Sequence, residues 1–289
     1  MNKIPPVYGE ETEYPLSWER NDIEQKIGLG GGRYTTVSMP LTFFMSLVAT
    51  IIFYAIVFAI PANWFVDMFT QRGITPYPTV FLGFWTAFIL LIKQKKVRHQ
   101  RTTLGYSILP STRDFVLTPL TVDVVLKNIH EIAENPRDFV LYHRIILTLS
   151  NLRNIGKVSD VDNLLRSQAE QDENTMETSY TMLNGFLWAI PILGFIGTVL
   201  GLSSAIGNFG SVLTTEADLS QLIPTLKLVT GGLSTAFETT LIALVIALFL
   251  QLYATGVKKS EEEFLDECSE YCSANIVSRL RMDYGDRTE

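Results

Sequence analysis

Four long stretches almost free of charged side chains alternate with polar segments along the chain. They cover residues 39–60, 74–92, 182–213 and 228–257, and Glu238 is the one charged residue within them. A helix of about 20 apolar residues crosses the hydrocarbon core of a bilayer. The pattern therefore predicts four transmembrane helices.

The charges that flank these stretches predict their orientation. Residues 93–101 follow the second stretch and contain five basic residues and no acidic one. Because Lys and Arg gather at the cytoplasmic ends of membrane helices, this end is expected in the cytoplasm, and the N-terminus with it. The loop after the third stretch carries Glu216 and Asp218 and no Lys or Arg, as expected outside, and Lys258 and Lys259 close the fourth stretch inside.

This pattern predicts an all-α membrane protein with four transmembrane helices and both termini in the cytoplasm. A cytoplasmic helical insert is expected between two transmembrane hairpins. The expected parts are an N-terminal segment 1–38, a first hairpin 39–92, the insert 93–181, a second hairpin 182–257 and a C-terminal tail 258–289.

Apolar residues at helical spacing predict two helices in the first part of the insert, separated by Asn135-Pro136. A third is expected to begin near Val161 after a cap at Ser159-Asp160. The residues expected to form the buried faces of the first two are Leu120, Val124, Val125 and Ile129, then Ile145, Leu149 and Leu152.

Composition excludes several classes of function. Charged residues make up 18% of the 289 residues, against about 25% in soluble domains. The net charge of -7 argues against a nucleic-acid partner, which requires a basic face. Cys268 and Cys272 lie four residues apart with no histidine nearby, so we expect reduced structural thiols and no metal site. We expect that the chain is not an enzyme and binds no cofactor.

The third apolar stretch carries small residues at a spacing that favours close helix packing. Gly197, Gly201 and Ala205 recur every four residues, and Gly194 precedes them. Small residues let helix backbones approach closely in lipid, so we expect this stripe to pack inside an assembly. Thr198 lies within it, and a buried threonine read alone usually bonds a carbonyl of its own helix.

The fourth stretch contains a candidate site at Glu238, because a charge inside a membrane segment is costly and is usually functional. Glu238 and Thr240 point about 200° apart on a helix, so they cannot face one narrow pore. Lys227 lies about 16 Å away along the same face, too far to pair with Glu238. Glu238 and Lys227 are left as a possible ion path or a polar contact between subunits, with a neutral Glu238 as the alternative.

Two motifs on these helices resemble the MotA/TolQ/ExbB proton-channel family. The first is Pro191-Ile192-Leu193-Gly194-Phe195-Ile196-Gly197-Thr198-Val199-Leu200-Gly201. The second is Ala236-Phe237-Glu238-Thr239-Thr240-Leu241-Ile242-Ala243-Leu244. The resemblance spans about residues 160–260, and four helices with a cytoplasmic insert resemble MotA more than the three-helix TolQ and ExbB. The family glycine of the second motif is Ala243 here, and a proline that often follows is Phe249.

The resemblance implies a subunit of an ion-driven motor in a bacterial inner membrane. It implies a homopentamer around a dimeric one-helix partner similar to ExbD, TolR or MotB, which supplies a membrane Asp. Thr198 and Thr240 match the threonines that line the ion path beside that Asp, and Pro191 matches the proline next to it. Protons, or sodium ions in some members, are the transported species, and no cofactor is implied. A partner carboxylate also fits the residues themselves, because the chain lacks a relay of carboxylates along one helix face.

Two other functions stay open at this stage. A transporter or channel acting alone is disfavoured by the absence of matching halves, which transporters built from repeats show. A membrane scaffold without ion flux would use the small-residue stripe equally well. Which process the motor drives is left open.

Overall fold

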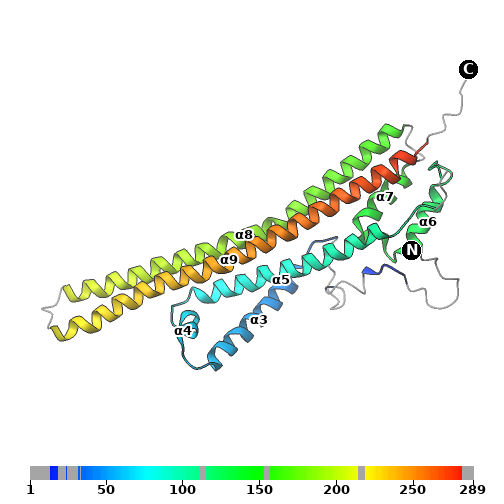
Figure 1. Cartoon of the computed structure of the whole chain (residues 1–289). Coiled ribbons are helices and arrows are strands. Elements are labelled where there is room, and N and C mark those ends of the chain that lie inside the picture. The colour runs from blue at the N-terminus through cyan, green and yellow to red at the C-terminus, as the bar shows by residue number, and fades with distance from the viewer. Residues whose placement is uncertain are drawn as a thin grey trace, which may run out of the picture. The chain divides into compact units, whose positions relative to one another are not determined.

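The computed structural model describes residues 14–18, 24, 32, 34–110, 115–152, 157–213 and 219–281. Most of the predicted N-terminal segment, Glu216 and Asp218, and the end of the tail lie outside these ranges. Every regular element within them is a helix, which confirms the all-α prediction (Figure 1). The helices are α3 (Met39–Ala59), α4 (Trp64–Thr70), α5 (Pro76–Arg101), α6 (Val122–Ile132), α7 (Val140–Ser150), α8 (Val158–Leu213) and α9 (Leu219–Asn275), with short 3₁₀ turns at Thr102–Gly105, Pro136–Asp138 and Val277–Arg279.

Four of the described helices, α3, α5, α8 and α9, are long and apolar enough to cross a membrane. This is consistent with a multi-pass membrane protein. The last two continue far beyond their apolar stretches: α8 begins at Val158 in the insert, and α9 runs through Lys258 and Lys259 to Asn275. No Gly or Pro lies between residues 157 and 184, so nothing in the backbone ends α8 where its composition changes.

The connection between α3 and α5 contains a short helix, α4. It forms because the side chain of Asn63 caps the helix by accepting a hydrogen bond from the Val66 amide at 3.0 Å. Val66, Met68 and Phe69 of α4 are buried in one cluster with Tyr54 of α3. The helix is therefore held by its cap and by its apolar face.

The chain divides into two compact units. We call Val37–Gln94 with Glu177–Lys259 the membrane unit, and Met1–Thr36, Lys95–Met176 and Ser260–Glu289 the polar unit. α5, α8 and α9 each contribute residues to both units.

Aromatic packing joins the first hairpin of the membrane unit to α9. The rings of Tyr54 and Tyr77 stack with centroids 4.6 Å apart, and Ile242 of α9 is buried in the same cluster. At the other end of this unit, Lys93 Nζ donates to Ser179 Oγ at 2.8 Å and lies 4.5 Å from the centroid of the Tyr180 ring. Both ends of α5 within the unit are thus fixed by contacts.

In the polar unit the predicted apolar faces are partly wrong. Leu120 is 89% exposed, because α6 begins only at Val122, and Val124 within α6 is 47% exposed. Val125 and Ile129 are buried as predicted, together with Val122. The face predicted for the next helix is confirmed, since Ile145, Leu149 and Leu152 are all buried. The third helix of the insert begins at Val158, three residues before its predicted start at Val161.

The two cysteines lie on the part of α9 that belongs to the polar unit. Both are free thiols and both are buried, as a structural role predicts. Burial raises the pKa of Cys272 to about 11 and raises that of Cys268 as well. The thiols are therefore protonated at neutral pH and poorly reactive.

Candidate functional site

Small residues bring α8 and α9 into backbone contact in the membrane unit. A Cβ atom added at Gly201 would lie 2.7 Å from the Ala236 nitrogen and 2.7 Å from the Gly232 carbonyl oxygen. One added at Gly194 would lie 2.5 Å from the Ala243 Cβ. Real Cβ atoms do not approach this closely, so larger side chains are excluded at both positions. We call this contact the α8–α9 seam.

The seam changes the interpretation of the small-residue stripe. Ala205 is buried against Gly232, where an added Cβ would lie 3.0 Å from the Ala205 Cβ. The sequence interpretation assigned the stripe to contacts inside an assembly, but Gly194, Gly201 and Ala205 meet α9 of the same chain. The reason is that α9 carries small residues of its own opposite each position, which a reading of α8 alone does not reveal.

The hydroxyls of Thr198 and Thr240 meet across the seam, one from each helix. Thr198 Oγ1 also lies 3.1 Å from the Ala236 carbonyl oxygen, and Thr240 Oγ1 lies 3.0 Å from the Gly194 carbonyl oxygen. Both side chains are half-buried. The two threonines thus form one polar point at the seam, with each hydroxyl able to donate to a carbonyl of the opposite helix.

Pro191 lies inside α8, one turn before Gly194, and is half-buried. Proline has no amide hydrogen, so the Leu187 carbonyl loses its usual helical hydrogen bond from residue 191. The structure therefore places a weakened turn of α8 about two turns before Thr198.

Thr239 has a packing role that the sequence did not single out. Its side chain is buried, its hydroxyl donates to the Thr235 carbonyl at 2.9 Å, and it occupies the space beside Gly197. Thr75, directly before α5, also reaches this point, since a Cβ at Gly197 would lie 2.8 Å from Thr75 Oγ1. Thr239 thus packs α9 against α8 and α5, while Thr240 faces Thr198.

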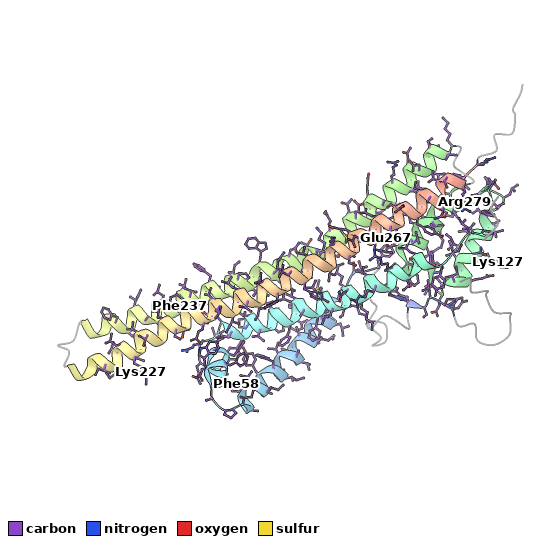
Figure 2. The ribbon with its side chains drawn as sticks, in the orientation of Figure 1. Phe58, Lys127, Lys227, Phe237, Glu267 and Arg279 are labelled. Atoms are coloured by element: carbon purple, nitrogen blue, oxygen red, sulfur yellow. The ribbon has the colours of Figure 1, made fainter. Side chains whose placement is uncertain are left out.

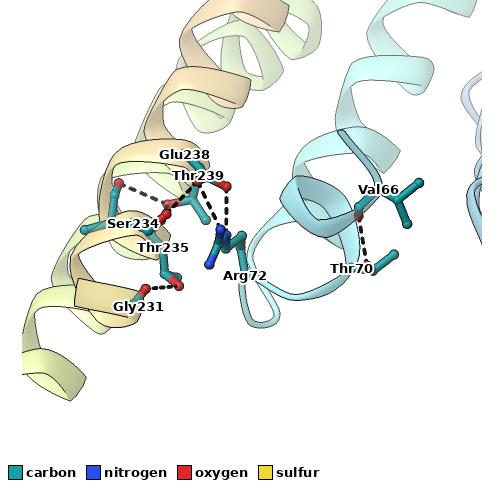
Figure 3. Close-up of polar contacts among 9 residues, drawn as sticks. Val66, Thr70, Arg72, Gly231, Ser234, Thr235, Glu238 and Thr239 are labelled. Atoms are coloured by element: carbon teal, nitrogen blue, oxygen red, sulfur yellow. Dashed lines mark hydrogen bonds and ion pairs between the residues drawn. The ribbon is translucent and has the colours of Figure 1, made fainter. Parts of the chain in front are cut away.

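Glu238 has a partner within the chain, from the connection between α4 and α5 (Figure 3). Arg72 Nε donates to Oε2 at 2.7 Å and its Nη2 donates to Oε1 at 3.1 Å. Ser234 Oγ, one turn earlier on α9, donates to Oε1 at 2.6 Å. The Arg72 and Glu238 side chains are 20% and 13% exposed, so the ion pair is largely buried.

The sequence interpretation left Glu238 as an ion-path residue or a contact between subunits, and missed Arg72. The signal available in the sequence was that Arg72 is a charged residue in the short connection between the first two apolar stretches. Lys227, the other candidate, is exposed and lies near the N-terminal end of α9, well before Phe237 (Figure 2). The structure does not bring Lys227 to Glu238.

The four apolar helices and the tight α8–α9 seam define the class: an all-helical, multi-pass membrane protein. Residues 135–270 match the MotA/TolQ/ExbB proton channel family. The match contains both motifs and the whole seam, and it confirms the family resemblance read from the sequence. No curated protein and no solved structure matches the chain.

Proposed function

We propose that the chain is the proton-conducting subunit of an ion-driven motor in a bacterial inner membrane. Five copies surround the membrane helices of a dimeric one-helix partner similar to ExbD, TolR or MotB. Proton flow turns one component against the other and so does mechanical work. The observation that carries this proposal is the meeting of the Thr198 and Thr240 hydroxyls at the seam.

The chemistry of two facing hydroxyls suits a carboxyl group that gains and loses a proton. A hydroxyl has one donor and two acceptor lone pairs. While Thr198 or Thr240 donates to a backbone carbonyl, its lone pairs can accept from a protonated carboxyl. Rotation of the same hydroxyl offers its hydrogen to a carboxylate. The pair can therefore serve both protonation states of a partner Asp.

The carboxylate closest to Thr240 in sequence already has partners within the chain. Glu238 is the one carboxylate within the apolar stretches, and it is occupied by Arg72 and Ser234. It also points away from Thr240 on α9. This arrangement supports a division of labour in which the partner supplies the proton-carrying Asp.

Large apolar side chains on the outer surface of the membrane unit support contacts with lipid and with other copies. Trp188 is 75% exposed, Phe195 is 66% exposed and Phe237 is 65% exposed. Phe237 projects from α9 in Figure 2. Phe195 and Phe237 each precede a threonine of the pair by three positions, so we expect copies and partner to assemble around it.

We expect Thr198→Val and Thr240→Val to abolish partner-dependent proton flux in reconstituted vesicles. Valine keeps the shape and removes the hydrogen-bonding group, and a hydrogen bond to a charged group is worth about 1.5–3 kcal/mol, or about tenfold or more in flux. A pH-sensitive dye inside the vesicles measures the flux. Native mass spectrometry should show five copies for wild type and variants alike.

Thr239→Val is the matched control, because its hydroxyl bonds only its own helix and its side chain serves packing. It should keep the wild-type flux. Full flux in both other valine variants would contradict the assignment of the path. Wild-type flux without the partner would indicate a channel acting alone, and no flux with the partner would indicate a scaffold.

A further inference from the structure

The ion pair between Arg72 and Glu238 joins two parts of the membrane unit that are 166 positions apart in sequence. Arg72 belongs to the connection between α4 and α5, and Glu238 to α9. We propose that this pair is a latch that docks the start of α5 on the α8–α9 seam. In this role Glu238 positions Thr240 and does not carry protons. Because Thr240 is assigned to the proton path only under the proposed function, the inference rests on that function.

The hydrogen bonds of Glu238 fit a fixed carboxylate. It accepts two bonds from the guanidinium of Arg72 and a third from Ser234. A bidentate guanidinium–carboxylate pair is among the stronger polar contacts and is specific in its geometry. A carboxylate acting as a proton carrier would have to give up such bonds in every cycle, so this arrangement favours a structural contact.

The latch lies where it can set the rotation of α9. Successive residues of a helix are turned by about 100°, so Glu238, Thr239 and Thr240 point in three different directions. Glu238 is held by Arg72, Thr239 fills the space at Gly197, and Thr240 meets Thr198. A rotation of α9 by one residue would break all three contacts.

The start of α5 is tied to both helices of the seam through the same few residues. Arg72 binds α9, and Thr75, three residues later, lies at Gly197 of α8. Thr75 is buried, with 4% of its surface exposed. Its burial therefore reports whether the start of α5 is docked.

The first measurement is the reaction of a Thr75→Cys variant with a water-soluble thiol reagent in detergent. The native cysteines are buried and should react slowly. Adding Arg72→Gln or Glu238→Gln should speed labelling of residue 75 about fivefold or more, because each change removes a largely buried, bidentate ion pair. The charge-swapped variant Arg72→Glu with Glu238→Arg should restore the slow rate.

The second measurement is partner-dependent proton flux for the same Arg72 and Glu238 variants, made in the chain that keeps the native Thr75. Each single variant should lose about fivefold in flux, and the swapped variant should regain most of it. A swapped variant with slow labelling but no flux would show that the Glu238 carboxylate carries protons, and would overturn the inference. Single variants with unchanged labelling, or a swapped variant that still labels fast, would overturn the latch itself.

The two readouts separate this inference from the proposed function. If the wild type carries no flux with its partner, the proposed function fails, yet the labelling rates still decide whether the latch exists.

Discussion

At the scale of single residues, Arg144 on α7 is a buried charge of the polar unit. Its side chain is 2% exposed, and its Nη2 lies 2.8 Å from Asp172 Oδ2 on α8. Its Nη1 donates to Ser269 Oγ of α9 at 2.9 Å. Burial raises the pKa of Asp172 although Arg144 lies beside it, so the loss of hydration outweighs the attraction between the charges.

Arg144→Met should therefore lower the stability strongly, because it leaves the Asp172 carboxylate buried without its partner. Breaking such a pair costs about 3–5 kcal/mol, and thermal unfolding in detergent followed by circular dichroism measures it. Adding Asp172→Leu should restore most of the loss. Arg166→Met is the matched control, since its pair with Asp162 is exposed, and an equal loss there would contradict the explanation.

At the scale of elements, the α8–α9 seam depends on glycines rather than on apolar bulk. Gly201 contacts α9 backbone atoms directly, whereas a Cβ at Gly207, less than two turns further along α8, would meet nothing within 4 Å. The same helix thus carries some glycines that packing requires, such as Gly201, and others that it does not, such as Gly207.

Gly201→Leu should separate α8 from α9 within the chain and lower the thermal midpoint. Inserting a leucine against backbone atoms costs about 3 kcal/mol or more. Gly207→Leu should be neutral or slightly stabilising, because leucine favours a helix over glycine. The contrary result would be a Gly201→Leu variant that unfolds like the wild type but no longer forms the oligomer. The small-residue stripe would then serve contacts between copies rather than the packing of α8 on α9.

At the scale of the whole molecule, we expect the insert to lie in the cytoplasm and the α4–α5 connection to lie on the outer side of the membrane. Ser150 of the polar unit and Gln71 of the α4–α5 connection are both exposed. In cells with a permeabilised outer membrane, Gln71→Cys should react with an impermeant thiol reagent, and Ser150→Cys should react only after lysis. The buried native cysteines keep the background low. Labelling of Ser150→Cys in unlysed cells would overturn a cytoplasmic insert.

The sequence by itself determined the number and position of the membrane helices, the helical nature of the insert and the family. These depend on local properties: the length of an apolar stretch, the spacing of apolar residues and the order of residues in two motifs. It also separated Glu238 from Thr240, because their directions on a helix follow from their spacing alone.

Only the tertiary structure decided which surfaces meet. It placed Gly201 against Ala236 of the same chain, paired Glu238 with Arg72, and left Leu120 exposed where its spacing predicted burial. The physical reason is that a local pattern shows which face of a helix is apolar, small or charged, but not which distant segment covers it. Arg72 and Glu238 are 166 positions apart, and their contact exists only because the first hairpin folds onto the second.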